Sequence, residues 1–151
     1  MSQTDFDLPQ GVEVLRRTPR ILRAWLSGLS EEWTRCNEGG DTWNAYDVVG
    51  HLVHGERSDW IPRIRQILEG RGGEPFPPFD RLGHVKESEG KDLATLLDEF
   101  EEARGESLTA LEALDLGPND FHRPGTHPDF GPVDLGQLLA TWVTHDLTHL
   151  A

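Results

Sequence analysis

Apolar residues recur every three or four positions along four segments of this 151-residue chain. Such spacing places them on one face of a helix, so each segment is predicted to be an amphipathic helix. The segments cover residues 8–29, 45–69, 91–115 and 134–151. No alternating strand pattern lies between them. We therefore expect an all-α protein with a single domain over residues 1–151, built as a four-helix bundle.

Prolines interrupt two of these predicted helices. Pro19 divides the first segment, which is either a kinked helix or a short turn followed by a helix that begins at Thr18-Pro19. Pro62 lies inside the second segment and predicts a kink there or a break near Ser58.

Two long connections, residues 70–90 and 116–133, are rich in glycine and proline and have no periodic pattern. They are predicted loops, and the first separates the second helix from the third. We expect both loops, together with Trp142, to line a pocket. Trp33 and Trp43 lie between the first two helices, where we expect them to fill the core at one end of the bundle rather than to stack against a ligand.

The last helix carries the main chemical signal. Asp134 followed by Gln137 is typical of a helix start, and His145 and His149 then lie one turn apart on the same face. Two imidazoles at this spacing can bind one metal ion. The pair also arises by chance in a chain with seven histidines, so a metal site needs a third ligand.

The other histidines offer several candidates for that ligand. His51 lies on the buried face of the second helix, and His54 could share part of this face one turn later. A histidine on an apolar face is more often a core residue than a ligand, so position alone does not show whether His51 or His54 binds the metal. His84 is expected at the surface, whereas His122 and His127 could border a pocket at the end of the bundle.

Composition limits the classes of partner. The chain has 27 acidic and 14 basic residues, a net charge of −13, and this charge would repel a nucleic-acid backbone. No apolar run approaches the roughly 20 residues that a membrane-spanning helix needs. The single cysteine, Cys36, fits a reducing cytoplasm. We expect a cytoplasmic protein that binds neither nucleic acid nor membrane.

Two motifs in their order along the chain resemble the DinB superfamily of helical-bundle metalloproteins. They are DTWNAYDVVGHLVHGE in the second helix and THDLTHLA at the end of the fourth, and the segment RTPRILRAWLSGLS adds to the resemblance. The resemblance implies an up-and-down bundle and a metal held by His51, His145 and His149, and it favours His51 over His54. The fourth helix usually continues further in this family than Ala151, so we expect a looser site here.

The resemblance implies a divalent metal as cofactor, with zinc preferred and nickel, iron or manganese also suited to imidazole ligands. Asp47, Asp146 or main-chain carbonyls are the expected acceptors for the outer ring nitrogens. Characterised relatives include bacillithiol S-transferases and a mycothiol-dependent isomerase. The resemblance therefore implies a thiol S-transferase that acts on a small molecule with a low-molecular-weight thiol as co-substrate.

The same residues allow two alternatives to the transferase function, and the fold suggests an oligomeric state. A metal-dependent hydrolase could use the same site, with Glu56 as the nearest acidic residue able to act as a base. A non-enzymatic helical binding module would instead have its imidazoles bonded to backbone carbonyls. Bundles of this type often pair through helix faces, so a homodimer is expected as the partner state.

Overall fold

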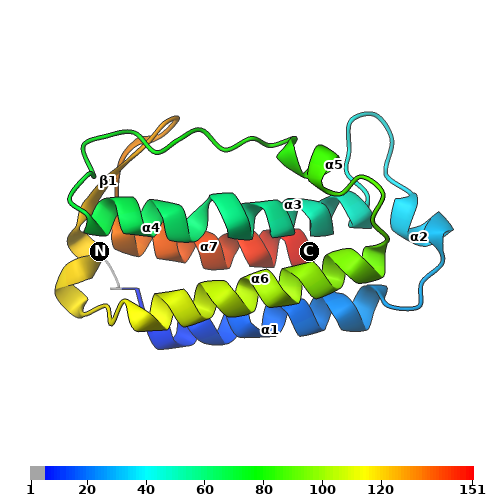
Figure 1. Cartoon of the computed structure of the whole chain (residues 1–151), viewed down its shortest axis with the longest axis horizontal. Coiled ribbons are helices and arrows are strands. Elements are labelled where there is room, and N and C mark those ends of the chain that lie inside the picture. Colours follow the sequence, from blue (N-terminus) through cyan, green and yellow to red (C-terminus); the bar gives the residue numbers. More distant parts are fainter. Residues whose placement is uncertain (1–5) are drawn as a thin grey trace.

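The computed structural model describes residues 6–151 as a bundle of four helical rods with a long connection along one side (Figure 1). The rods are α1 (Leu8–Leu26), α3 (Ala45–Ser58) continued by α4 (Trp60–Leu68), α6 (Leu93–Ala113) and α7 (Leu135–Leu150). The shorter elements are α2 (Glu31–Arg35), α5 (Gly83–Glu87), the 3₁₀ helix η1 (Pro118–His122), β1 (Pro124–His127) and β2 (Gly131–Asp134). The predicted four-helix bundle is confirmed.

The directions of the rods differ from a simple up-and-down bundle. The rods α1 and α7 run one way, whereas α3–α4 and α6 run the other way (Figure 1). Each of α1 and α3–α4 contacts both α6 and α7. The connection between α4 and α6 travels back along the bundle, and only such a long crossover allows two consecutive rods to be parallel. Helical periodicity carries no information about direction, so the sequence could not reveal this.

The segment predicted as the second loop contains a small antiparallel hairpin. Strands β1 and β2 pair from Pro124↔Asp134 to His127↔Gly131. The backbone N–H of Phe76 donates to the carbonyl of Thr126 at 2.9 Å, which ties the crossover to the hairpin. An added Cβ at Gly125 would lie 2.7 Å from the Phe76 ring, so this close contact requires glycine. The protein is therefore mostly helical rather than all-helical.

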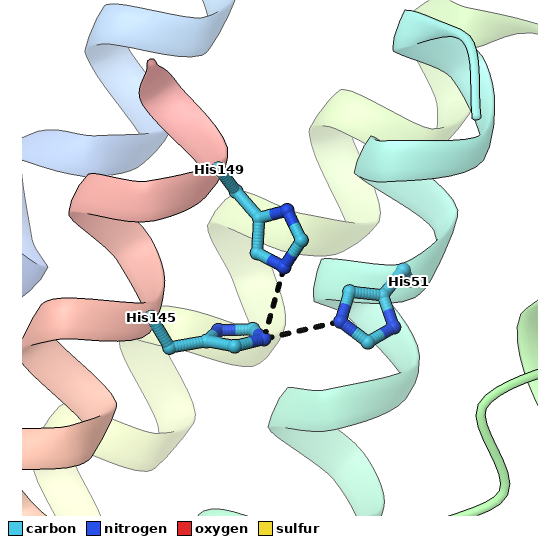
Figure 2. Close-up of side chains that lie close together, drawn as sticks. All are labelled: His51, His145 and His149. Atoms are coloured by element: carbon cyan, nitrogen blue, oxygen red, sulfur yellow. Dashed lines mark hydrogen bonds between the residues drawn. The ribbon is translucent and has the colours of Figure 1, made fainter. Parts of the chain in front are cut away.

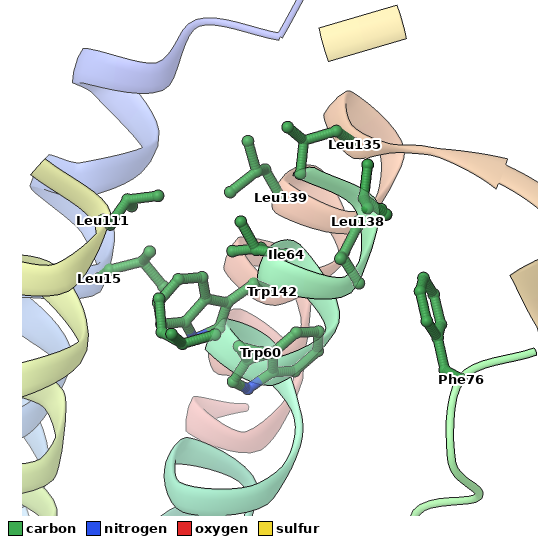
Figure 3. Close-up of a cluster of buried hydrophobic side chains, with 11 residues drawn as sticks. Leu15, Trp60, Ile64, Phe76, Leu111, Leu135, Leu138, Leu139 and Trp142 are labelled. Atoms are coloured by element: carbon green, nitrogen blue, oxygen red, sulfur yellow. The ribbon is translucent and has the colours of Figure 1, made fainter. Parts of the chain in front are cut away.

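The core consists of two apolar clusters along the bundle. The first joins α4 to α7, where the rings of Trp60 and Trp142 stack with centroids 5.8 Å apart (Figure 3). The second joins α3 to α6 and includes Val49, Leu52 and Phe100. Burial of these faces is the main source of stability for the rods.

The two prolines have different effects. The second rod breaks at Asp59, between α3 and α4, as Pro62 predicted. The rod α1 continues through Pro19, so the alternative of a turn before a shorter helix is wrong. Proline has no N–H to donate to the carbonyl four residues earlier, which is that of Leu15. This carbonyl instead accepts a hydrogen bond from Nη1 of Arg104 at 2.8 Å.

Among residues 6–151, no helix has the length and apolar character that a membrane crossing requires.

Candidate metal centre

Three histidine side chains from two antiparallel rods point toward one another (Figure 2). His51 comes from α3, and His145 and His149 come from the last two turns of α7. Nε2 of His145 lies 3.1 Å from Nε2 of His51 and 3.1 Å from Nε2 of His149. The three ligand nitrogens all lie within 4.8 Å of one another. The structure thus brings together the three residues named as ligands, whereas metal binding itself stays a prediction.

The spacing of the His145 nitrogen from each of the other two fits a divalent metal ion. Imidazole nitrogen binds zinc at about 2.0–2.1 Å, so two nitrogens 3.1 Å apart subtend about 100° at the ion. This angle lies between the tetrahedral and octahedral values. Three such ligands leave at least one coordination position open, which is typical of catalytic rather than structural sites.

The electrostatics of the cluster keep its imidazoles neutral. Burial, followed by the repulsion of neighbouring imidazoles, lowers the pKa of His51 to about 3. Burial and the proximity of His149 lower the pKa of His145 to about 4. Burial also lowers the pKa of His149. Metal ligation requires neutral imidazoles, and these three are available for it at neutral pH.

These shifts predict that acid destabilises the metal-free protein. In the unfolded chain the imidazoles protonate near the ordinary pKa of 6.5, whereas folded His51 and His145 protonate only near about 3 and about 4. The unfolded state therefore binds more protons below pH 6.5, and the free energy of unfolding falls as the pH is lowered. Urea unfolding at pH 7, 6 and 5 measures this, and His51→Gln should flatten the slope. Equal slopes for wild type and variant would contradict the assignment.

The outer nitrogens of two of these rings lack partners. Nδ1 of His51 and of His145 are buried and make no hydrogen bond within residues 6–151. The expectation that Asp47, Asp146 or main-chain carbonyls accept from these two nitrogens is wrong. Asp47 is used in the capping box of α3 with Asn44, and both carboxylate oxygens of Asp146 accept from Arg104.

Glu56, the candidate base, is held in the protein interior. It is 4% exposed, and its Oε1 accepts from Nε of Arg104 at 2.8 Å and from Nε1 of Trp142 at 3.0 Å. A carboxylate bound in this way to a buried guanidinium is a structural anchor. The geometry therefore gives no support to a role for Glu56 as a base at the histidines.

The anchor centres on Arg104, which is 1% exposed and connects all four rods. Its guanidinium donates to Glu56 of α3, to both oxygens of Asp146 on α7 and to the carbonyl of Leu15 on α1. Although burial opposes its charge, the bonds to Asp146 and Glu56 raise the pKa of Arg104. Asp146 follows His145 directly, and Glu56 shares α3 with His51. The anchor therefore fixes the two rods that carry the candidate ligands.

The remaining histidines of the bundle lie outside the cluster. Nδ1 of His54 lies 3.0 Å from Oε1 of Glu87 on α5, and the His54 ring packs against Gly83, where a Cβ would approach Nε2 to 2.5 Å. His84 is 1% exposed, so its expected surface position is wrong. The sequence missed α5 because a helix of five residues is too short to show a period.

An open recess of about 510 Å³ adjoins the histidine cluster. Its walls include Trp43 and Trp60, the crossover residues Phe79 and Arg81, and His127 of the hairpin. Both predicted loops thus contribute to the pocket, as expected. Trp43 is not the core residue that we expected, because it is half-buried and lines the recess, with its ring 4.8 Å from that of His51.

Other expectations for residues of the recess and of the core are wrong or incomplete. Trp142 is fully buried and does not line the recess, and His122 does not line it either. Trp33, expected in the core, is 70% exposed because α2 lies outside the bundle. Asp59 and Arg63 also line the recess, and no sequence pattern marks them beyond their position near the helix break.

Comparisons with known proteins agree with this fold. The sequence model of the DinB superfamily matches residues 15–151. A protein of Oceanobacillus iheyensis named "Putative metal-dependent hydrolase OB0782" is 22% identical over 157 residues, which cover 98% of this chain and 84% of that protein.

Two solved structures share the architecture. YfiT from Bacillus subtilis, described as "a probable metal-dependent hydrolase with an unusual four-helix bundle topology", superposes with a TM-score of 0.78 at 21% identity, covering 100% of this chain and 87% of YfiT. The four-helix bundle protein TT2238 superposes with a TM-score of 0.62 at 18% identity, covering 94% of each chain.

Proposed function

This chain belongs to the DinB superfamily, and we propose that it is a metal-dependent hydrolase whose metal ion is held by His51, His145 and His149. The observation that carries the proposal is the convergence of three neutral imidazole nitrogens beside an open recess. The hydrolase names of OB0782 and YfiT support it further.

The proposed roles of the metal ion and of the surrounding residues follow from the three nitrogen ligands. Three neutral nitrogen ligands leave a divalent ion its full charge, so a bound ion supplies Lewis acidity to hydrolysis. Zinc suits this donor set best, and nickel, iron and manganese also accept imidazole ligands. The rings of Trp43, Trp60 and Phe79 exclude water from the recess walls, while Arg104 holds α3 and α7 at the required spacing.

A thiol S-transferase is the second candidate, and the arginines of the recess favour it. Arg63 and Arg81 line the space next to the histidines, where they would suit a negatively charged low-molecular-weight thiol. A non-enzymatic binding module receives less support. It requires imidazoles bonded to backbone carbonyls, whereas the three Nε2 atoms face one another and two Nδ1 atoms are unpaired in the described chain.

Assays with and without thiol distinguish the two enzymes. Zinc-loaded protein should hydrolyse members of a panel of aryl esters and anilides in the absence of any thiol, and removal of zinc by a chelator should abolish turnover. Product release is followed by absorbance. Turnover that appears only with a thiol and an electrophile such as monobromobimane would instead establish the transferase. Zinc uptake without turnover in either assay would contradict both enzymatic proposals.

A further inference from the structure

One wall of the recess holds a guanidinium that is fixed but not fully bonded. Arg63 of α4 is 6% exposed and forms an ion pair through Nε with Asp59. Its Nη2 donates to the carbonyl of Pro77 at 3.5 Å, and its Cζ lies 5.2 Å from the centre of the Phe76 ring. Within residues 6–151, Nη1 has no hydrogen-bond partner. A guanidinium held on three sides therefore presents free donors to the recess.

A second free donor lies on the hairpin side of the same recess. Nδ1 of His127 accepts from the backbone N–H groups of Asp129 at 3.1 Å and Phe130 at 3.3 Å. Because Nδ1 is an acceptor, a neutral His127 carries its proton on Nε2. Proximity to Arg63 adds to burial in lowering the pKa of His127, which keeps this ring neutral. Nε2 has no partner in the described part of the chain.

The acidic groups of the recess do not use these donors. Asp59 is already paired with Arg63 through Nε, and Asp129 is exposed to solvent at the border. Neither donor is among the buried side-chain atoms without a partner in residues 6–151, so water can serve both until a ligand with matching acceptors replaces it. The best acceptor for a fixed guanidinium is an oxyanion such as a carboxylate or a phosphate, which can accept two parallel N–H bonds.

We propose that Arg63 and His127 bind an oxyanionic group of the substrate, so that this enzyme acts on small acidic molecules whose reactive bond reaches the three histidines. The statement that such molecules are turned over at the histidines rests on the proposed function. The statement that Arg63 and His127 bind an anion does not. The aromatic walls formed by Trp43, Trp60 and Phe79 suit an apolar middle part of such a molecule. A recess of about 510 Å³ is within the usual range for small-molecule sites.

Binding of matched aromatic ligands to the metal-free protein tests this proposal. The probes are phenylacetate, phenyl phosphate and the uncharged phenylacetamide, titrated by ligand-observed NMR so that no metal competes for the anion. At least one of the two anions should bind tenfold or more tightly than the amide. The stronger of the two identifies a carboxylate or a phosphate as the preferred group. Equal binding of all three probes would overturn the proposal.

Variants locate the anion site. The double variant Asp59→Asn, Arg63→Gln removes the ion pair as a unit, so that no buried charge is left alone. It should weaken anion binding at least tenfold, and His127→Phe should weaken it severalfold. Arg65→Gln changes an exposed arginine of the same helix outside the recess and should bind as wild type does. Unchanged anion binding in the double variant and in His127→Phe would overturn the proposal.

A metal titration separates this inference from the proposed function. All the variants should still bind about one equivalent of cobalt(II) if the histidine site is intact. Selective anion binding in a protein that takes up no metal would support the anion site and contradict the hydrolase. Metal uptake without anion selectivity would contradict the anion site and leave the proposed hydrolase supported.

Discussion

Replacing Arg104 with methionine is expected to lower the free energy of unfolding by about 3–5 kcal/mol. The substitution leaves the carboxylates of Glu56 and Asp146 buried without their cation, at 4% and 0% exposure. It also removes the donor that serves the free carbonyl of Leu15. Urea unfolding of metal-free protein at pH 7 measures the change, with far-ultraviolet circular dichroism as the signal.

A surface variant supplies the control for this measurement. Arg17 pairs with Glu13 on the exposed side of α1, where both side chains are more than 60% exposed. Arg17→Met should therefore cost less than about 1 kcal/mol. A further variant, with Arg104→Met, Glu56→Gln and Asp146→Asn together, should recover part of the loss because no unpaired charge remains. Equal stability of the Arg17 and Arg104 variants would show that the buried ion pairs contribute nothing.

Replacing His145 with alanine is expected to remove metal binding. Nε2 of His145 is the only one of the three within 3.1 Å of both others, so its loss leaves His51 and His149 without a shared third ligand. Purified wild type should carry about one equivalent of metal or take it up from added zinc. The variant should bind at least about 100-fold more weakly, a larger effect than a change in the residues behind the ligands.

Elemental analysis and competition titration with a chromogenic chelator give the stoichiometry and the affinity. His51→Ala and His149→Ala should behave like His145→Ala. His54→Ala is the matched control, because this histidine lies on the same helix as His51 but pairs with Glu87 outside the cluster. Loss of metal in His54→Ala and retention in His145→Ala would contradict the assigned ligand set.

The sequence was sufficient for the four long rods and for the ligand candidates. Helical periodicity identified all four rods, and Pro62 marked the break that the structure has at Asp59. His51 was preferred over His54 by resemblance to a family. The reason is now visible in the structure, since only the His51 ring faces α7 while His54 faces α5.

The buried ion pairs were missed, although a signal for them exists. Arg104 lies four residues after Phe100, Glu56 four after Leu52, and Asp146 four after Trp142. Each charge thus occupies the apolar stripe of its helix rather than the opposite face. Charged residues at stripe positions on three helices, with both signs present, indicate mutual pairing in the core. The reversed direction of α6 and the recess residues depend on tertiary contacts, which no local pattern encodes.

The proposed ligand set has a consequence for when in synthesis a metal could be captured. His51 and His145 are separated by 94 positions in the chain, and two of the three ligands come from the last two turns of the final rod. A nascent chain still lacking α7 on the ribosome presents one candidate ligand, too few to retain an ion. Closing so long a loop costs entropy that only the packed bundle repays. If these three histidines hold a metal, its capture is expected to follow folding, and metal content would then report that the polypeptide has reached its native topology.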